Sequence, residues 1–184
     1  MVLAWILEES ENRHSPNKKS PNVEVSEEEL LQLGVFFDKL NPDEYAEGER
    51  YLEDSKLKRY TTEQEYASHD ILEITKEKLF NYDKKLKCFY TEHFHKDDEI
   101  RYVVEGSGYF DFRNEKDEWV RVFIEKGDLI GIPAGIYHRF TLDESDYIKE
   151  VRLFVGDPIW LAVNRPADDH FTRKKYVKKY YLGQ

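Results

Sequence analysis

Four residues of this chain have the types and the spacing of a metal centre: His93, His95, Glu99 and His138. The first three lie within seven residues of one another, and the fourth ends a segment that begins at Gly127. Three imidazoles and one carboxylate form a ligand set that suits a borderline divalent transition metal. Such a metal can take up oxygen-rich ligands and dioxygen, so the sequence indicates an enzyme.

Strand geometry accounts for this spacing. Side chains two residues apart on a strand point to the same side, so the imidazoles of His93 and His95 can reach one metal through bonds of about 2 Å. Glu99 opens the next strand and can close the site with its carboxylate. His138 must come from a distant strand, and the turn at 133–135 would place it there.

The wider pattern resembles the two motifs of the cupin superfamily, which here read His93-x-His95-x3-Glu99-x6-Gly106 and Gly127-x5-Pro133-x-Gly135-x2-His138. Leu142 stands where the superfamily pattern has Asn, at a turn position that is not a ligand. The alternative is that these histidines lie in the core or on the surface without a metal. A His-x-His pair alone would arise by chance in about a fifth of chains with this histidine content, so the joint spacing carries the hypothesis.

Composition places the chain among globular proteins with much β-structure. Hydrophobic residues make up 40%, charged residues 36% and aromatic residues 15% of 184 residues, which is enough for one domain with a core. The formal net charge of −10 argues against nucleic acid as a partner. The basic run over 173–179 is expected to be a solvated terminal face.

A single cysteine, Cys88, excludes an intrachain disulfide and fits a reducing compartment. The apolar opening over 1–7 lacks a basic region and a cleavage site, so it does not read as a signal peptide. No stretch approaches the length of a membrane span. We therefore expect a cytoplasmic protein, with the nucleus as a second location.

Helices are predicted mainly in the first half of the chain. Ser26 and Glu29 form a capping-box pattern, Gly34 suits a helix end, and Pro42 suits a first helical position. The predicted elements are a strand over 1–7, a loop over 8–24, a helix over 26–34, an extended segment over 35–37 and a mostly helical segment over 43–84.

From residue 86 onward the pattern changes to short strands separated by turn signals. The predicted strands cover 86–90, 100–104, 109–113, 119–124, 129–132, 137–142 and 147–155, with turns that include 106–108 and 156–158. We expect one domain over 1–184, mainly β with flanking helices: a helical part over about 25–84, a barrel core over about 86–156 and a tail over 157–184 that wraps back.

Three further residues are candidates for the surroundings of the metal. Arg101 shares the strand face of Glu99, and it would either hold an anionic substrate or form a structural salt bridge with a neighbouring carboxylate. Phe140 shares the face of His138, and it would either wall the pocket or pack in the core. Arg152, on a later strand, faces either the pocket or solvent.

The remaining histidines are expected to be structural. His14 lies in a polar loop, and His69 lies in the predicted helical segment. For His170, a structural role in the tail is favoured over a role in the site.

Longer blocks of the chain resemble the acireductone dioxygenases of the eukaryotic type, a family of the methionine salvage pathway. The similarity covers almost the whole chain and is weakest over 8–24 and 52–68. The matching blocks are Ala4-Trp5, Leu33-Gly-Val35, Glu92 to Tyr102, Gly106 to Asp111, Glu125 to Asp128, Pro133 to Asp143, Arg152 to Gly156 and Asn164 to Asp168.

This resemblance implies a cupin double-stranded β-helix, or jelly-roll, barrel with the N-terminal helices packed outside. It implies one Fe(II) or Ni(II) per chain, bound by His93, His95, Glu99 and His138 with two positions open to water. The substrate would be acireductone, 1,2-dihydroxy-5-(methylthio)pent-1-en-3-one. With iron and dioxygen the family gives formate and 4-methylthio-2-oxobutanoate; with nickel it gives formate, carbon monoxide and 3-methylthiopropionate.

The resemblance also implies roles for side chains near the metal. Arg101 would steady the substrate anion, and Phe140 and Arg152 match pocket positions. Glu99 would act as the base if it briefly leaves the metal, which we treat as a hypothesis. Family likeness further suggests a monomer. Two other classes stay open, a cupin that binds a metal or small ligand without oxygen chemistry and a zinc cupin isomerase, although Arg101 and the block that starts at Arg165 favour the dioxygenase.

Overall fold

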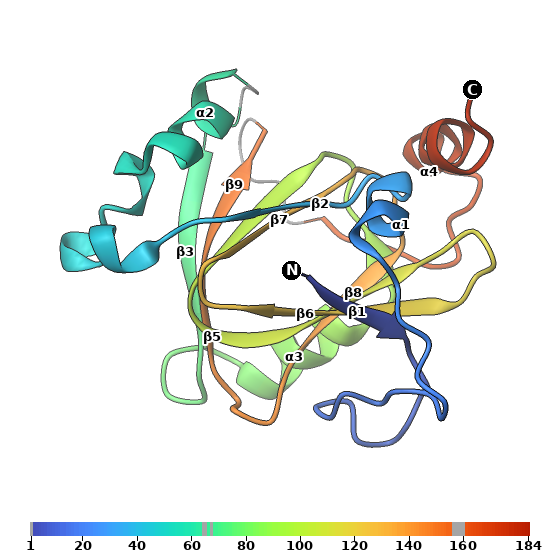
Figure 1. Cartoon of the computed structure of the whole chain (residues 1–184), viewed down its shortest axis with the longest axis horizontal. Coiled ribbons are helices and arrows are strands. Elements are labelled where there is room, and N and C mark those ends of the chain that lie inside the picture. The colour runs from blue at the N-terminus through green and yellow to red at the C-terminus, as the bar shows by residue number, and fades with distance from the viewer. Residues whose placement is uncertain (1, 64–65, 67, 156–160) are drawn as a thin grey trace.

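Two antiparallel sheets share one long strand, β5 (Glu99–Arg113), in this computed structural model, which describes residues 2–63, 66, 68–155 and 161–184 (Figure 1). The first half of β5 pairs with β7 (Asp128–Ile132) and β9 (Ile148–Phe154). Its second half pairs with β6 (Trp119–Glu125) and β8 (His138–Leu142). The mainly β fold class predicted from the sequence is thus confirmed.

Five further strands extend the two sheets, and each pairs in antiparallel fashion with another strand of its sheet. They are β1 (Leu3–Ile6) on β6, β2 (Phe36–Lys39) on β7, β3 (Ser68–Ile74) on β9, β4 (His93–Phe94) on β8 and β10 (Val163–Asn164) on β4. Segments from the beginning and the end of the chain therefore complete the same sheets as its middle.

The bend of β5 corrects the sequence prediction of two strands, 100–104 and 109–113, separated by a turn at 106–108. The register with β9 shifts between Val103 and Glu105, and Gly106 adopts a positive φ of 74°. A Cβ atom on Gly106 would lie 2.2 Å from the carbonyl oxygen of Tyr147. The glycine therefore allows a β-bulge within one strand, and the bulge turns that strand from one sheet into the other.

The helices lie at the outside of the sheets. The capping box of Ser26 and Glu29 is present at α1 (Glu27–Gln32), which confirms that predicted helix. The others are α2 (Ser55–Glu63), α3 (Tyr82–Tyr90) and α4 (Phe171–Tyr176), followed by a π-helical turn, η4 (Val177–Tyr181). Figure 1 shows α2 and α4 at opposite ends of the molecule. Three 3-10 segments, η1 (Pro42–Tyr45), η2 (Glu47–Glu49) and η3 (Tyr51–Glu53), precede α2.

Two further predictions of local structure are wrong. The mostly helical segment over 43–84 contains β3, whose pairing with β9 over seven residue pairs outweighs the helical pattern and places His69 on a strand. The predicted extended segment 86–90 belongs to α3, because Tyr82 and Leu86, four residues apart, form the buried face of a helix.

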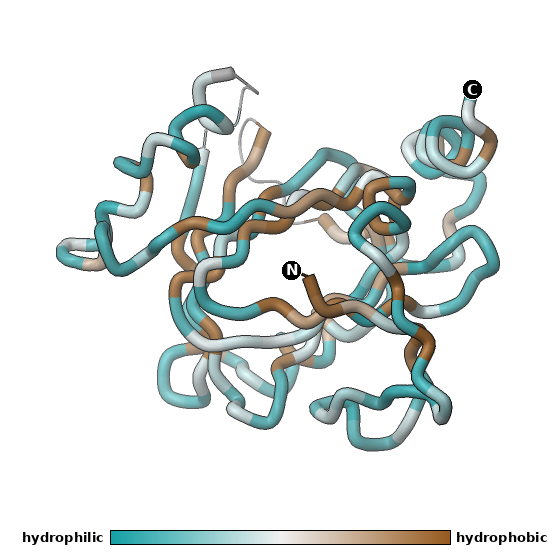
Figure 2. Tube along the Cα trace, viewed as in Figure 1, coloured by the Kyte–Doolittle hydropathy of each residue, from teal (hydrophilic) through white to brown (hydrophobic). Residues whose placement is uncertain are grey.

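The core lies between the sheets, where hydrophobic residues concentrate along the central strands, while α2 and the outer loops are largely hydrophilic (Figure 2). Tyr176 of α4 is buried in the same cluster, and its hydroxyl donates to the carbonyl of Leu33 at 2.8 Å. The tail therefore packs back onto the barrel at β10 and α4, whereas the predicted turn at 156–158 lies outside the described residues. Within the described ranges, no helix has the length and apolar character needed to cross a bilayer.

Replacing Gly106 by Ala tests whether the bulge is required. Strain at positive φ costs about 1–3 kcal/mol, and the clash with the Tyr147 carbonyl adds to it, so Gly106→Ala should lower the free energy of unfolding in urea by at least about 3 kcal/mol. Gly48→Ala is the matched control, since Gly48 has a φ of 67° and a Cβ there would meet only Arg50 Cγ, at 3.8 Å. Equal losses in the two variants would contradict the role of the bulge.

Candidate metal centre and its cavity

Three histidines form a cluster at two adjacent strands, β4 and β8. His93 begins β4, His95 follows it by two residues, and His138 begins β8 as the cross-strand partner of His93. Their ligand nitrogens all lie within 4.8 Å of one another. The prediction that these three imidazoles converge is therefore confirmed, and the nitrogen cluster fits a single metal ion.

Hydrogen bonds to backbone carbonyls orient two of the rings. His93 Nδ1 lies 2.6 Å from the Thr91 carbonyl oxygen, and His138 Nδ1 lies 3.0 Å from that of Ile136. A carbonyl can only accept, so Nδ1 carries the proton in both rings and Nε2 keeps its lone pair for a metal. Burial, together with the neighbouring His138, lowers the pKa of His93 to about 3, and burial also lowers the pKa of His95. His93 and His95 are thus neutral at physiological pH, as metal ligation requires.

The Glu99 carboxylate is buried beside this cluster and has one oxygen to spare. Its Oε2 accepts from Arg101 at 2.5 Å, while its Oε1 lies 3.4 Å from His138 Nε2. Among the described residues, Oε1 has no hydrogen-bond partner. Burial raises the pKa of Glu99, but the positive charge of Arg101 outweighs it and holds this pKa well below 4.5. An ionised oxygen therefore faces the histidines without a protein donor.

A row of charged residues crosses three neighbouring strands next to the cluster. Arg101 of β5 is the cross-strand partner of Arg152 of β9, which in turn is the partner of Asp70 of β3. Arg152 binds Asp70 in bidentate fashion at 2.7 and 2.6 Å. Arg101 lies between two carboxylates, Glu99 at 2.5 Å and Glu150 at 3.4 Å. Both arginines line the cavity, so Arg152 does not face solvent.

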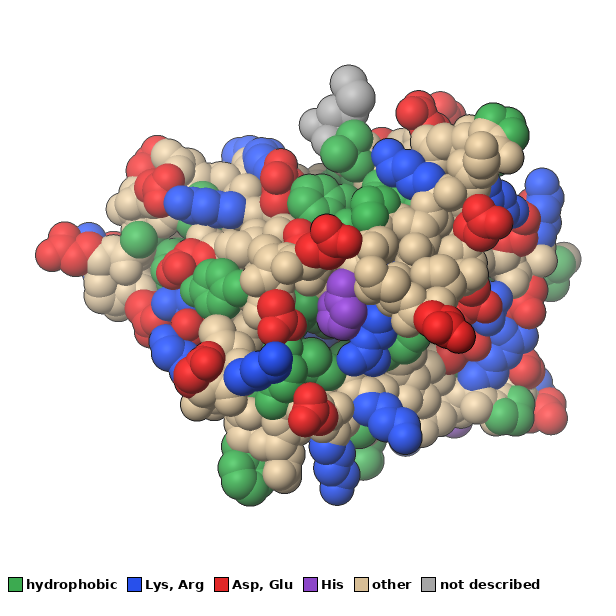
Figure 3. Space-filling model, turned by 90° about the horizontal axis from the view of Figure 1, so that it is seen from below, with side chains coloured by type: hydrophobic (Ala, Val, Ile, Leu, Met, Phe, Trp, Pro, Cys, Tyr) green, Lys and Arg blue, Asp and Glu red, His purple; other side chains and the backbone are tan. Residues whose placement is uncertain are grey.

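The cavity at the histidines has a volume of about 450 Å³, which suits a small molecule. Phe140 lies on its wall, with ring centroids 5.1 Å from Phe110 and 6.5 Å from Phe89. One part of the lining is apolar, and its residues are Leu72, Ile74, Phe89, Phe110, Phe140 and Ala162. On the face shown in Figure 3, a histidine side chain is visible between acidic, basic and hydrophobic groups.

Several lining residues were missed from the sequence. Glu150 is buried, its Oε2 has no hydrogen-bond partner in the described part of the chain, and burial raises its pKa. Strand alternation could have found it, because it lies two residues before Arg152 and so shares its face. Other residues were missed because β3 and α3 were assigned wrongly; they are Asp70, Leu72, Ile74, Lys85, Cys88 and Phe89.

The other histidines lie outside the cluster. His170 caps α4, where its Nδ1 accepts from the Thr172 N–H at 3.2 Å, and its ring contacts Phe94, so its predicted structural role is confirmed. His14 lies 3.0 Å from a backbone carbonyl of β8, and His69 is exposed on β3.

An antiparallel double sheet with a buried histidine cluster is the arrangement of cupin metalloproteins. The family model described as the ARD/ARD′ family matches residues 3–162, and the chain therefore belongs to this family.

Sequence similarity to known proteins extends over nearly the full length of the chain. Acireductone dioxygenase from Gallus gallus is 51% identical over 97% of this chain and 96% of its own length. The protein of that name from Homo sapiens is 48% identical over 100% of this chain and 99% of its own, and acireductone dioxygenase 4 from Arabidopsis thaliana is 49% identical over 95% and 90%.

A solved structure confirms the fold. It is described as acireductone dioxygenase from Bacillus anthracis with cadmium ion in active center, and it matches with a TM-score of 0.71. The match covers 89% of this chain and 98% of that one, at 24% sequence identity.

Replacing single histidines tests the cluster. His93→Ala or His138→Ala should weaken Co(II) binding by more than about 100-fold, since even the loss of a partner outside the ligand sphere costs about 10–100-fold. Equilibrium dialysis with metal analysis measures this. His69→Ala removes an exposed histidine and should bind Co(II) as the unaltered chain does; a similar loss in this control would contradict the assignment.

Proposed function

We propose that His93, His95, His138 and Glu99 hold one Fe(II) or Ni(II) ion in this chain, an acireductone dioxygenase of methionine salvage. One observation carries the proposal: an ionised carboxylate oxygen without a protein donor, Glu99 Oε1, faces a cluster of three imidazoles. Nitrogen and carboxylate ligands of this kind suit both metals, and neither the ligands nor their geometry chooses between them.

When bound, such a metal would act as a Lewis acid that the enediol oxygens can chelate, and it would favour loss of the enediol proton. The surrounding side chains bind and orient the substrate. Arg101 Nε is buried without a hydrogen-bond partner in the described residues, so it is available to a substrate anion. Arg152 adds a second positive charge, and Phe140 with the apolar part of the lining accommodates the methylthio end.

We also propose that Glu99 acts as the base. Its carboxylate is ionised, and its Oε1 is the oxygen that can accept the enediol proton. Arg101 keeps hold of Oε2 meanwhile, so the carboxylate can change partners on one side without losing its position.

Features outside the site support three further proposals, which concern the domain organisation, the oligomeric state and the location of the protein. We infer one domain over 1–184, because β1, β2 and β3 each pair with a strand of the predicted barrel core. We further infer a monomer in the cytoplasm, and also in the nucleus, from family likeness and from the single exposed cysteine, which suits a reducing compartment. Size-exclusion chromatography with light scattering tests the monomer.

Replacing Glu99 by Gln tests its two proposed roles. The amide keeps an acceptor for Arg101 but loses the charge, so Glu99→Gln should weaken Co(II) binding at least about 10-fold and lower kcat about 100-fold when the site is saturated. Glu125→Gln, on an exposed position of β6, is the control and should change neither quantity. A Glu99→Gln protein with full metal content and full turnover would end this assignment.

Oxygen consumption with synthetic acireductone tests the activity itself. Apoprotein loaded with Fe(II) should take up dioxygen and release formate with 4-methylthio-2-oxobutanoate, whereas the same preparation loaded with Ni(II) should release carbon monoxide. Mass spectrometry and gas analysis identify the products. No uptake by fully iron-loaded protein would favour a cupin that only binds its ligand, and isomerised substrate with Zn(II) would favour the isomerase.

A further inference from the structure

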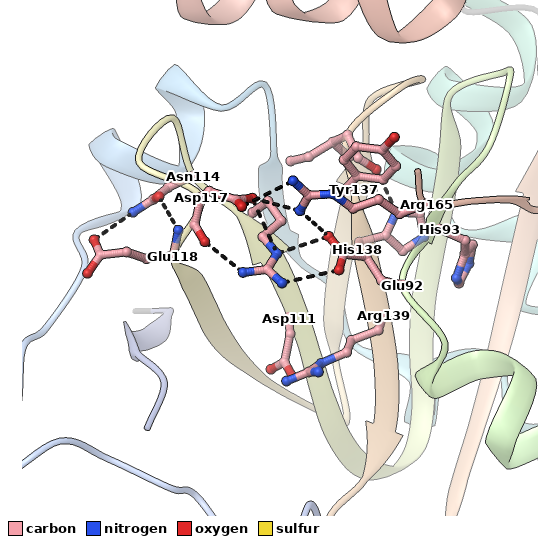
Figure 4. A network of polar contacts seen from close by, with 12 residues as sticks. Glu92, His93, Asp111, Asn114, Asp117, Glu118, Tyr137, His138, Arg139 and Arg165 are labelled. Carbon is pink, nitrogen blue, oxygen red and sulfur yellow. Dashed lines mark hydrogen bonds and ion pairs between the residues drawn. The ribbon is translucent and has the colours of Figure 1, made fainter. Parts of the chain in front are cut away.

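Four charged side chains gather beside the metal-ligand strands, and none of them lines the cavity. They are Glu92, Arg113, Asp117 and Arg165, which we call the arginine–carboxylate cluster. Figure 4 shows Glu92 with Arg165 on one side of the network and the turn that carries Asp117 on the other. The proposed reaction assigns no task to this cluster.

The cluster is a closed set of short ion pairs. Arg113 binds Glu92 in bidentate fashion at 3.0 and 3.1 Å, and Arg165 NH1 donates to Glu92 Oε1 at 2.8 Å. Arg165 also binds Asp117 in bidentate fashion at 2.7 and 3.1 Å. Two guanidiniums and two carboxylates thus neutralise each other, and the bidentate geometry fixes their orientation.

Partial burial makes the two ion pairs of Glu92 stronger than ordinary surface ion pairs, whereas Asp117 is 58% exposed. The side chains of Arg113, Glu92 and Arg165 are 18%, 20% and 29% exposed. The guanidinium of Arg113 lies 3.8 Å from the ring centroid of Trp119, and that of Arg165 lies 5.0 Å from that of Tyr137. Contacts of this kind hold side chains in one position, because they are only weakly screened by solvent.

Each of the two oriented histidines follows its orienting carbonyl by two residues. The cluster includes or contacts the residue that lies between them in the chain. His93 is oriented by the carbonyl of Thr91, and Glu92 lies between them. His138 is oriented in the same way by the carbonyl of Ile136, and Tyr137 lies between them. The direction of each ring therefore depends on a three-residue segment whose middle side chain is held from outside the cavity.

Arg165 contacts both of these middle residues. Its guanidinium donates to Glu92 and lies over the ring of Tyr137, and its backbone N–H donates to the Glu92 carbonyl at 3.1 Å. The residue before it, Asn164, is the cross-strand partner of His93. The Tyr137 hydroxyl also accepts from the Ala167 N–H at 2.8 Å, which ties β8 to the same C-terminal segment.

We propose that Arg165 and Glu92 are positioning residues of the metal centre, which align His93 and His138 through the backbone of β4 and β8. Resting on the proposed function, this inference assigns the C-terminal segment a task in metal binding that the metal ligands alone do not reveal. A ligand that is correctly oriented before the metal arrives loses less conformational freedom on binding, so disturbing the cluster should lower affinity rather than abolish it.

Co(II) binding tests this inference without any turnover. Arg165→Gln and Glu92→Gln should each weaken Co(II) affinity about 10–100-fold, measured by competition with a chelator, and should change the visible ligand-field spectrum of the bound ion. Arg165→Lys keeps the charge but not the bidentate geometry, so it should restore affinity in part. Glu92→Gln nearly preserves shape, and it provides the test if Arg165→Gln does not fold.

Lys149→Gln is the matched control. Lys149 is 12% exposed and pairs with Glu49 at 2.7 Å, so its loss costs a comparable ion pair away from the histidines. Wild-type Co(II) affinity and spectrum in both Arg165→Gln and Glu92→Gln would overturn the inference, even if the metal-free variants unfold more readily. If the unaltered chain itself bound no Co(II), the proposed metal centre would be wrong. This outcome differs from the one that overturns only the positioning role of Arg165 and Glu92.

Discussion

The pairing of β5 with four other strands is the constraint on which the site depends. Because β5 bends at Gly106, one half belongs to each sheet, and both sheets face a common interior. Glu99 and Arg101 come from its first half, while the register of its second half with β8 places His138. Candidate ligands that are far apart in the chain thus meet because a single strand aligns both sheets.

In the site itself, the atoms that orient each side chain differ from the atoms that are left to bind a metal. Backbone carbonyls orient His93 and His138 and leave Nε2 free, while Arg101 holds one Glu99 oxygen and leaves the other free. In each case the protein binds one polar atom of the side chain and leaves the other polar atom without a hydrogen bond. Buried atoms with unused lone pairs are costly unless a ligand binds to them, so the arrangement itself argues for a bound cation.

The sequence predicted the histidine cluster well because strand alternation and motif spacing are local properties. His93, His95 and His138 needed only period-2 geometry and the spacing of two motifs. Glu150 and the residues of β3 could not be found in this way. Ile71, Leu72 and Ile74 fit a helical stripe as well as a strand, and only the pairing with β9, about 80 residues away, decides for the strand. The cluster around Arg165 escaped notice for the same reason, because its contacts join segments distant in sequence.

The charged side chains at the cavity cancel one another, so the net positive charge that favours an anionic substrate would come from the metal. Glu99, Glu150 and Asp70 carry as many negative charges as Arg101, Arg152 and Lys85 carry positive ones, and all six lie in the cavity lining or bind a residue of it. The protein shell is therefore neutral when all six are ionised. A divalent cation held there would add two positive charges to a poorly solvated space, and these charges would favour the anionic form of an enediol. The overall charge would thus favour loss of the enediol protons, and Glu99 remains the group proposed to accept one of them.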